Sequence, residues 1–339
     1  MACLIMRLAC VALTFAILLV ACSTPLYRPI SKRAENELAR RTLSPDATKN
    51  HIIGAGAVKV AVTGPDIISL PITFQQRCPF VPVAVNGLRP RLFLFDTGAG
   101  ISVLQSATAL KSKATLLSSQ VLPLKGQGIA GSEPFLGSLV RVQIGQLGIE
   151  NMPAFVRKHR NDLAILGRWI TQSLDVDILG YNPLSKFCTF LSLDYRAQRL
   201  TLGTKTPFTP PPGVTPIPLI RRGGLPYVRL RSGSVQWDAL VDSGSSFGIE
   251  LPLEVAKRLD LEKDAIPVAD DFQYGIGGQV DVKKAGIRVT RMPRLEGLGT
   301  PLEDYPVSIR PDLALIGSHF LRQFRVTFDF RNSLLYLER

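Results

Sequence analysis

Short runs of alternating hydrophobic and polar residues recur along the chain and predict β-strands. Alternation with a period of two, bounded by glycine and proline, is typical of half-buried strands. The clearest runs are residues 80–85, 91–94, 140–144, 226–230, 237–240 and 285–289. The chain also contains 28 glycines and 25 prolines among its 339 residues, which fits many short strands joined by turns. We therefore expect an all-β, barrel-like fold.

These runs occur in the same order twice, which indicates an internal repeat. Each copy has a strand pair, an aspartate-containing turn, a glycine-rich tip, further strands, two apolar residues with a glycine, a short helix and a final hairpin. The repeat predicts two domains, residues 71–204 and 217–339, joined by a stiff proline-rich linker at residues 205–216. Residues 23–70 are interpreted as a tether.

An aspartate ends a strand-like run in each copy, and the residues that follow it are alike. The two aspartates are Asp96 and Asp242, 146 residues apart. Each precedes a hydroxyl residue, a glycine and a small residue, namely Thr97, Gly98 and Ala99 in the first copy and Ser243, Gly244 and Ser245 in the second. A buried carboxylate is costly unless it is hydrogen-bonded or paired. Two of them at matched positions indicate carboxylates that share a proton and activate water.

The ordered set of turn, glycine-rich tip and apolar-apolar-glycine segment resembles the aspartic proteases of the pepsin and retropepsin superfamily. The tips are residues 127–132 and 274–279, and the apolar segments are residues 178–180 and 315–317. The resemblance covers roughly residues 70–339 and is nearest to bacterial retropepsin-like proteins with fused tandem domains. It implies two β-barrel lobes that form one pseudo-twofold bilobal unit.

The resemblance also implies what the turn residues do. The carboxyls of Asp96 and Asp242 would lie close together, so that one of them keeps its proton. The ionised carboxylate would take a proton from water, and the protonated one would polarise the peptide carbonyl that this water attacks. Thr97 and Ser243 would hydrogen-bond across the axis. The glycines of both turns, without a Cβ, would let backbone amides approach the carboxylates.

The two turns differ at the residue after the glycine. Ser245 can donate a hydrogen bond toward Asp242, whereas Ala99 offers none to Asp96. A hydrogen bond to the charged form of a carboxyl favours that form. We therefore expect Asp242 to be the ionised, base-like member of the pair and Asp96 to hold the proton.

The glycine-rich tips are interpreted as flaps that close over an extended peptide and exclude water. Ordinary hairpin turns are the alternative interpretation. The residues concerned are Gly128, Ile129 and Gly131 in the first copy and Tyr274, Gly275 and Gly277 in the second. The two apolar-apolar-glycine segments are expected to be core that supports the turns. Asp194 and Asp329, near the final hairpins, are interpreted as structural.

The first 22 residues are interpreted as a processing signal. Arg7 precedes an apolar run at residues 8–20, which is too short to span a bilayer comfortably. The run ends at Cys22 in a pattern that resembles the lipobox of bacterial lipoproteins, and an ordinary cleaved signal is the alternative. By the same resemblance, Ser23 favours the outer membrane. We expect this signal to be cleaved so that Cys22 becomes the new N-terminus, and the protein to be lipid-anchored at Cys22 in the bacterial cell envelope, facing the periplasm.

The remaining cysteines and the histidines suggest no other chemistry. Cys78 and Cys188 stand in the first copy, in a compartment that permits disulfides, and are either bridged or free and buried. The histidines, His51, His159 and His319, lack the spacing of metal ligands. We expect neither a metal nor another cofactor.

The chain carries a net charge of +13, which bears on its partners. The basic excess is scattered over several short clusters, namely Arg89, Arg91, residues 157–160, residues 221–222 and residues 283–284. No aromatic residues interleave with these clusters, as they would on a surface that stacks nucleic-acid bases. We expect a solvated basic surface, with attraction to anionic lipid, and no nucleic-acid partner.

The sequence thus favours an envelope aspartic endopeptidase whose substrate is a peptide or protein. The alternative is a catalytically silent lipoprotein of the same fold that binds peptides or proteins. A third possibility is that each lobe pairs with its counterpart in another chain. The short linker and the non-identical turns favour pairing within one chain, as a monomeric pseudo-dimer.

Overall fold

A computed structural model describes most of the chain and confirms the all-β prediction, because strands make up more than half of the described residues. It describes residues 27–41, 60–117, 122–124, 133–157, 159–165, 168–171, 176–268, 272–275, 278–281 and 286–339. Three predicted features lie outside these ranges: the signal segment with Cys22, the first glycine-rich tip with Gly128, Ile129 and Gly131, and Gly277 of the second tip. In the described ranges, no helix has the length and apolar character needed to cross a bilayer.

The first lobe is a closed barrel of six strands. Around the barrel the strands follow the order β11 (Leu147–Arg157), β7 (Ser102–Leu104), β14 (Ile178–Gly180), β6 (Arg91–Asp96), β5 (Cys78–Val85) and β10 (Glu133–Ile144). Pairing of β10 with β11 closes it. Phe93 and Phe95 of β6 belong to the main apolar core and are at most 1% exposed. The barrel therefore places the end of β6, and with it Asp96, next to a densely packed core.

The second lobe repeats this strand order. Its strands are β24 (Arg288–Leu295), β25 (Leu302–Arg310), β20 (Ile249–Pro252), β26 (Leu315–Gly317), β19 (Val235–Asp242) and β18 (Leu225–Ser232). The central strand of each lobe runs parallel to the apolar-apolar-glycine strand: Gly180 pairs with Asp96 and Gly317 pairs with Asp242. Each aspartate thus ends a central strand at the same place in its lobe.

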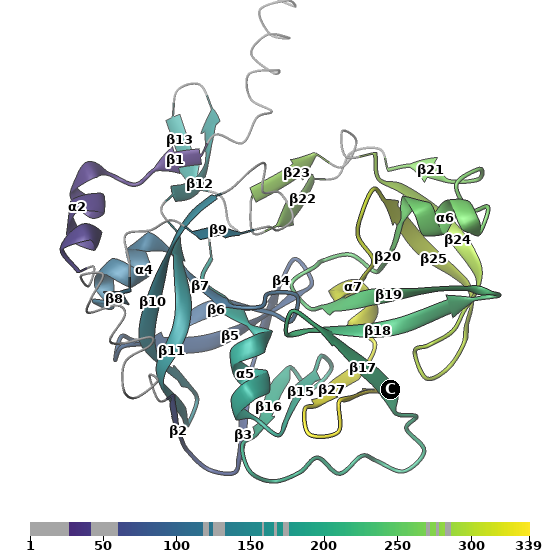
Figure 1. The fold of residues 1–339 in the computed structure, drawn as a ribbon, viewed down its shortest axis with the longest axis horizontal. Coiled ribbons are helices and arrows are strands. Elements are labelled where there is room, and N and C mark those ends of the chain that lie inside the picture. Colours follow the sequence, from purple (N-terminus) through teal and green to yellow (C-terminus); the bar gives the residue numbers. More distant parts are fainter. Residues whose placement is uncertain are drawn as a thin grey trace, which may run out of the picture.

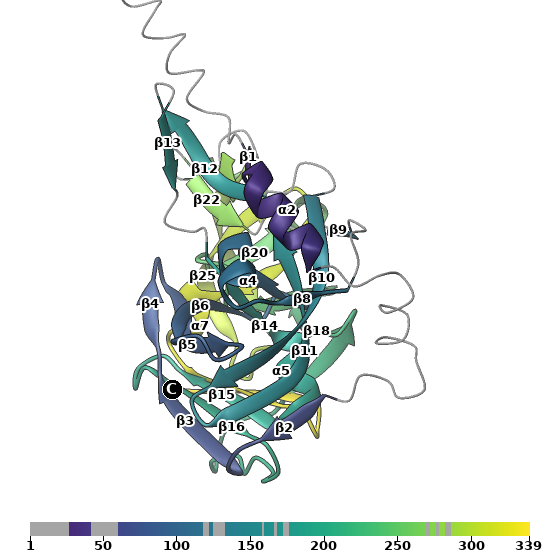
Figure 2. The same ribbon diagram turned by 90° about the vertical axis from the view of Figure 1, so that its left-hand side faces the viewer.

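One sheet contains strands from both lobes and joins them. Its order is β3 (Ile67–Pro71), β16 (Arg199–Gly203), β15 (Phe190–Asp194), β27 (Arg325–Asp329), β28 (Leu334–Glu338) and β17 (Ile217–Arg222). Strands β15 and β27 are antiparallel partners, with Leu191 opposite Phe328. Both residues are at most 1% exposed. The shared sheet lies at the bottom of Figures 1 and 2 and fixes one lobe against the other.

The predicted tether, residues 23–70, is partly built into the fold, which corrects its boundary. Strand β2 (Ala61–Thr63) pairs with β11, and β3 pairs with β16. The reason is the alternation in β3, where Ile68 and Leu70 are buried while their neighbours are exposed. Helix α2 (Lys32–Arg40) begins at the N-cap Ser31, buries Leu38 and lies beside α4 (Ser106–Lys111) in Figures 1 and 2.

The remaining elements are short. They are β1 (Tyr27–Pro29), β4 (Thr73–Gln75), β8 (Thr115–Leu116), β9 (Leu122–Leu124), β12 (His159–Ile165), β13 (Arg168–Thr171), α5 (Tyr181–Phe187), α6 (Leu253–Arg258), β21 (Ile266–Pro267), β22 (Phe272–Gly275), β23 (Gly278–Asp281) and α7 (Ser318–Leu321). Helices α5 and α7 each begin directly after the glycine of an apolar-apolar-glycine strand. Each lobe thus has a short helix next to its aspartate turn.

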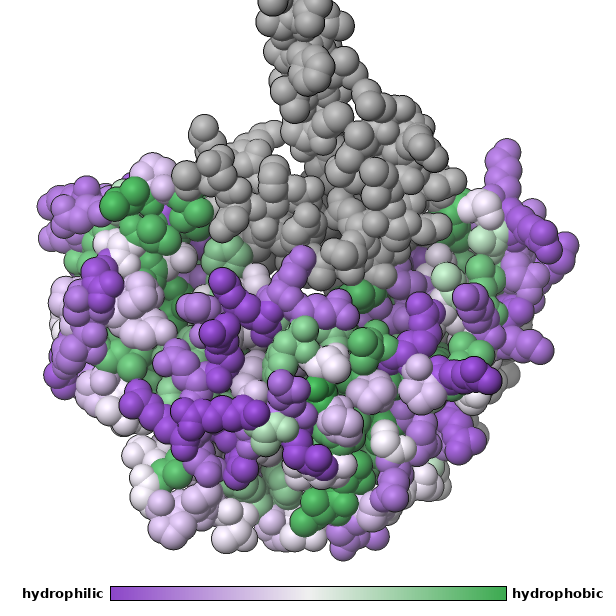
Figure 3. Space-filling view, turned by 180° about the vertical axis from the view of Figure 1, so that it is seen from behind, coloured by the Kyte–Doolittle hydropathy of each residue, from purple (hydrophilic) through white to green (hydrophobic). Residues whose placement is uncertain are grey.

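The outer surface mixes charged and apolar side chains. On the face seen in Figure 3, hydrophilic and hydrophobic residues are interspersed. Many arginines pair with nearby acids, for example Arg229 with Asp238 at 2.8 Å and Arg291 with Asp304 at 2.7 Å. Exposed pairs of this kind contribute about 0–1 kcal/mol each. Acids thus pair with part of the 40 basic side chains, and the net charge of +13 is what remains after all 27 acids are counted.

Candidate active site

The two aspartate turns meet between the lobes, so that each glycine faces the carboxyl of the other turn. A Cβ added to Gly244 would lie 2.5 Å from Asp96 Cγ, and one added to Gly98 would lie 2.6 Å from Asp242 Cγ. No real Cβ approaches another atom so closely. The absence of a side chain at these positions therefore makes room for the carboxyl of the opposite turn. The sequence had suggested room for backbone amides, and the amides of both glycines also bond the carboxyl of their own turn.

A reciprocal set of hydrogen bonds ties the turns together through Thr97 and Ser243. The Thr97 amide donates to Ser243 Oγ (3.1 Å), and the Ser243 amide donates to Thr97 Oγ1 (2.9 Å). Each hydroxyl in turn donates to a carbonyl of the opposite strand, Thr97 to Val241 and Ser243 to Phe95, both at 2.7 Å. Both hydroxyl residues are at most 1% exposed. Because all four groups are satisfied without water, the turns are held rigidly against each other.

Backbone amides hold both carboxyl groups. The Gly98 amide donates to Asp96 Oδ1 (2.8 Å), and the Gly244 amide donates to Asp242 Oδ1 (2.9 Å). The Ser245 amide adds a further bond to Asp242 Oδ1 at 3.1 Å. These bonds fix the plane of each carboxyl and favour its ionised form.

The two carboxyls have unequal proton affinities. Burial raises the pKa of Asp96 well above its usual range, and the adjacent negative charge of Asp242 raises it further. Burial also raises the pKa of Asp242, but the hydrogen bond from Asp96, the two amides and the positive charge of Arg310 oppose this rise. Within this coupled pair, these causes favour the protonated form of Asp96 and the ionised form of Asp242.

The source of this asymmetry differs from the one expected. The hydroxyl of Ser245 was expected to donate to Asp242, but the hydrogen bond comes from the Ser245 amide. The hydroxyl oxygen instead accepts from the Phe247 amide at 3.4 Å, and the hydroxyl interacts with the carboxyl of Glu250. The side chain turns away from Asp242 because a buried acid and a backbone amide compete for it.

Further side chains support the second turn, and the sequence did not single them out. Ser318 Oγ donates to the Ser243 carbonyl at 2.7 Å and lies 3.0 Å from the hydroxyl of Tyr195, a residue of the first lobe. Cys78 Sγ, also of the first lobe, donates to the Gly244 carbonyl at 3.2 Å. The residue after the glycine of the apolar-apolar-glycine segment is Tyr181 in the first lobe and Ser318 in the second. This difference was the one sign in the sequence that Ser318 has a role at the second turn.

The two cysteines left open by the sequence are free and buried. Burial raises the pKa of the Cys78 thiol, and the charges of Asp242 and Asp96 add to this effect, so the thiol is a neutral donor. Burial also raises the pKa of Cys188, to about 12. In the described part of the chain, no three His, Cys, Asp or Glu side chains form a group that could hold a metal ion.

The apolar-apolar-glycine strands β14 and β26 lie directly behind the turns. Gly180 leaves no room for a side chain, because a Cβ would lie 2.6 Å from the Ile101 carbonyl oxygen. A Cβ on Gly317 would lie 2.4 Å from the Phe247 oxygen. The residues before both glycines are buried. These strands therefore support the turns and expose no side chain to a substrate.

Asp194 and Asp329 lie at hairpin ends, away from the two turns. Asp194 accepts from the Ala197 amide (2.8 Å) and pairs with Arg325 (2.8 Å). Asp329 accepts from the amides of Arg331 and Asn332, both at 3.1 Å. Carboxylates that satisfy local turn amides in this way stabilise hairpins.

The second glycine-rich tip forms part of a β-hairpin. Strand β22 pairs with β23, with Tyr274 opposite Gln279 and Gly275 opposite Gly278. In Figures 1 and 2 this hairpin lies on the side of the molecule opposite the shared sheet. Both the flap interpretation and the alternative of an ordinary hairpin turn predict this strand pairing.

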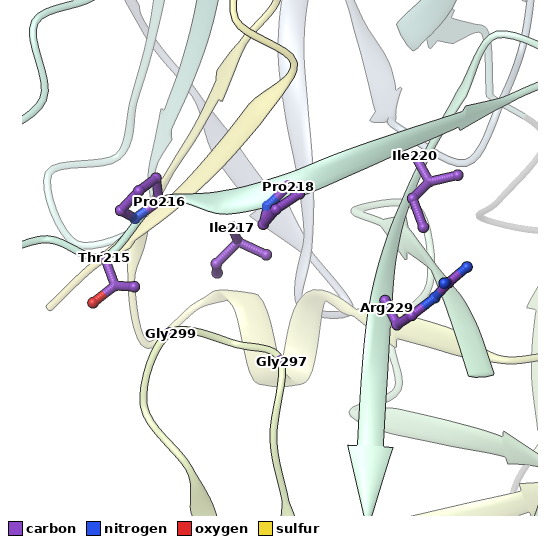
Figure 4. A pocket seen from close by; sticks show the side chains of 8 residues that line it. All are labelled: Thr215, Pro216, Ile217, Pro218, Ile220, Arg229, Gly297 and Gly299. Carbon is purple, nitrogen blue, oxygen red and sulfur yellow. The ribbon is translucent and has the colours of Figure 1, made fainter. Parts of the chain in front are cut away.

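A separate groove lies in the second lobe, at the start of β17 and beside β18. Its lining, drawn in Figure 4, consists of Thr215, Pro216, Ile217, Pro218, Ile220, Arg229, Gly297 and Gly299. None of these residues belongs to the aspartate turns or to the predicted tips. The groove is therefore distinct from the site formed by the turns.

The closeness of the turns predicts that a methyl group at either glycine will disrupt the site. Gly98→Ala or Gly244→Ala should push the opposite carboxyl off its amide and lower any peptidase kcat/KM by about a hundredfold or more, since small misplacements of reacting groups have such effects. Gly100→Ala is the matched control, because its Cβ would lie 3.8 Å from Leu225 Cδ2, an ordinary contact. Equal activity of Gly98→Ala and Gly100→Ala would contradict the described approach.

Comparison with known proteins agrees with this geometry. Residues 81–170 match the model of a family described as aspartyl protease. This span runs from β5 through the Asp96 turn to β13. No curated protein matches the chain. Together with the barrel and the turns, the match over residues 81–170 supports a likeness of this part of the chain to the retropepsin- and pepsin-like aspartic proteases.

Proposed function

We propose that this protein is an endopeptidase in which Asp96 and Asp242 activate one water molecule. The observation that carries the proposal is a pair of half-buried carboxyls, each packed against the glycine of the other turn. Two like charges so close together cannot both ionise readily, so the pair holds a single proton over a wide pH range. Such a pair can both accept and donate a proton.

The reaction uses this proton twice. Asp242, as the carboxylate, accepts a proton from the water, and the oxygen attacks the peptide carbonyl carbon. Asp96 gives its proton to the carbonyl oxygen, which stabilises the tetrahedral intermediate. Asp242 then gives the proton taken from water to the peptide nitrogen, and Asp96 takes a proton back from a hydroxyl of the intermediate as the C–N bond breaks. The products are a carboxylic acid and an amine, and both carboxyls return to their starting state. Thr97 and Ser243 take no part in proton transfer and hold the geometry.

The substrate of this reaction is a peptide or protein in extended form. The hairpin of β22 and β23, with Tyr274 and Gly275, and the first tip would close over it and exclude water. An extended peptide adds naturally to strand edges through backbone hydrogen bonds. We propose no nucleic-acid partner, and both lobes of one chain form the site, since β15 and β27 join them in one sheet.

We further propose that the protein is lipid-anchored at Cys22 in the bacterial cell envelope, at the outer membrane facing the periplasm. The supporting observation is the apolar run that ends at this cysteine. Incorporation of a labelled fatty acid into the wild type but not into Cys22→Ser tests the anchor.

The function is tested by incubating the full-length chain, purified in detergent, with a mixed peptide library across about pH 3 to 8. New termini should be detected by mass spectrometry, with internal cleavage sites and an optimum on the acidic side of neutrality. The double variant Asp96→Asn/Asp242→Asn controls for contaminating proteases. Cleavage that is equal in the double variant would exclude the mechanism. Peptide binding without cleavage would favour a silent binding protein.

A further inference from the structure

The surroundings of the two aspartate turns differ in polarity, although their strands match. Val103 of β7 lies opposite Ile178 of β14, and Glu250 of β20 lies opposite Leu315 of β26. Because β14 and β26 are equivalent strands, Glu250 occupies in the second lobe the place that Val103 has in the first. In the first lobe this place belongs to a small apolar cluster that includes Val103, Ile178 and Ala99. In the second lobe it holds an acid.

Glu250 is enclosed completely and is held by an arginine. Its side chain has no exposed surface, and its Oε1 accepts from Arg310 Nη1 at 3.0 Å. Arg310 ends β25 and is itself 5% exposed. Among the described residues, no donor completes a hydrogen bond to Glu250 Oε2. A buried ion pair is often no more stable than apolar residues of the same size, so the place of this pair behind the Asp242 turn points to a role beyond stability.

Glu250 and Arg310 are coupled electrostatically to the ionised member of the pair. The positive charge of Arg310 lowers the pKa of Asp242. The negative charge of Asp242 raises the pKa of Glu250, which burial brings to about 7 against the opposing effect of Arg310. Interactions between titrating groups are reciprocal, so an ionised Glu250 raises the proton affinity of the pair. Ser245 links the groups directly, since its amide bonds Asp242 and its hydroxyl interacts with Glu250.

No other charged side chain faces Glu250 from the elements packed around it, as far as the described residues show. Strand β26 contributes only Leu315, Ile316 and Gly317. Helix α6 buries Val255 and Ala256 on its inner side, and its Glu254 and Lys257 pair with each other at the surface. The charges that act on this position are thus those of Arg310 and Asp242.

We propose that Glu250 is a positioning residue for the aspartate pair, which with Arg310 widens the pH range over which the pair holds one proton. The proposal rests on the peptidase function proposed above. At acidic pH Glu250 is neutral, and the unopposed charge of Arg310 keeps Asp242 ionised. Near neutrality Glu250 ionises and its negative charge helps Asp96 to retain the remaining proton. In the first lobe the matched position is the apolar Val103, and the buried acid of that lobe, Asp177, lies at a different position.

The test is the pH dependence of kcat/KM for full-length wild type and Glu250→Gln on a peptide that the wild type cleaves. The alkaline limb of Glu250→Gln should move to lower pH by about one unit, as expected for the loss of one charge a few ångströms away. Its acid limb should not move, because Glu250 is already neutral there. Asp177→Asn is the matched control: this buried carboxyl of the first lobe accepts from the Gln105 amide and Thr108 Oγ1, both at 2.7 Å. It should lower stability and leave both limbs in place.

Two further measurements keep the proposal falsifiable. The infrared band of protonated carboxyls, measured as a function of pH, reports the titration of the Asp96–Asp242 pair and needs no substrate turnover. If the wild type cleaves no peptide, only the proposed peptidase function is refuted, because the titration of the pair can still be measured. If Glu250→Gln fails to fold, the double variant Glu250→Leu/Arg310→Met replaces both charges. In this variant the pH range over which the enzyme is active, or over which the infrared band shows one proton on the pair, should be narrower at both its acid and its alkaline end. The proposal would be overturned if either variant folds and its alkaline limb and the titration of its aspartate pair are the same as in the wild type.

Discussion

Replacing Asp96 alone, or Asp242 alone, with asparagine is expected to lower kcat/KM for peptide hydrolysis by at least about a thousandfold. Acid–base assistance typically contributes about a hundred- to ten-thousandfold per group, and each substitution removes one of the two partners between which the proton moves. Because the carboxyls act as one unit, the double variant should be no less active than either single variant. The measurement is kcat/KM on one peptide for all three variants.

The same substitutions should preserve or increase the stability of the fold near neutral pH. Burial raises the pKa of both carboxyls, so the folded state retains protons that the unfolded chain releases. Their contribution to stability is therefore present below the unfolded pKa of about 4 and declines as the pH rises above it. Asparagine removes this decline and can keep the amide hydrogen bonds of the turns. Chemical denaturation at pH 5 and pH 7 measures the effect.

Asp329→Asn separates a functional buried acid from a structural one. Asp329 is 1% exposed and caps the β27–β28 hairpin through two backbone amides. Its replacement should lower the free energy of unfolding by about 1–2 kcal/mol, because hydrogen bonds to a charged group weaken. Peptidase activity should be unaffected.

A single asparagine variant at Asp96 or Asp242 that still cleaves as fast as the wild type would refute the shared mechanism.

The strand order and the meeting of the turns could be anticipated from the sequence because their signals are local. A strand-like run, an aspartate, a hydroxyl residue and a glycine are adjacent in the chain, and each lobe carries them in the same order. The hydrogen bonds of Thr97 and Ser243 follow from that arrangement once the lobes face each other. The local sequence of each turn, together with the comparison of the two repeats, was sufficient to predict the strand order and the meeting of the turns.

The supporting residues could not be anticipated, because tertiary packing alone brings them to the site. Cys78 reaches Gly244 across 166 residues, and Tyr195 reaches Ser318 across 123. Glu250 lies between two apolar residues in a strand-like run, a pattern that favours exposure of the acid. It is buried because β20 lies between β25 and β26 and its outer face is covered as well.

Arg310→Met is expected to be the most destabilising substitution near the site. It removes the partner of a completely buried carboxylate, and breaking a buried ion pair on one side costs about 3–5 kcal/mol. This is a large part of the 5–15 kcal/mol that is typical of the stability of a domain. Without Arg310 the pKa of Glu250 rises further above 7, because the arginine opposes the effect of burial. The loss should therefore be greatest at pH 8 and smaller at pH 5, where Glu250 is neutral.

A double-mutant cycle decides whether this loss reflects the pair or the packing of the arginine. If the unpaired charge is responsible, Glu250→Leu/Arg310→Met should recover most of the stability lost in Arg310→Met, since apolar replacement of a buried pair is often neutral. Arg291→Met is the surface control, because its pair with Asp304 is 60% and 70% exposed and should contribute less than about 1 kcal/mol. A double variant as unstable as Arg310→Met would show that the arginine stabilises this lobe through packing. A stable double variant with a narrowed pH profile would show that the pair is kept for catalysis.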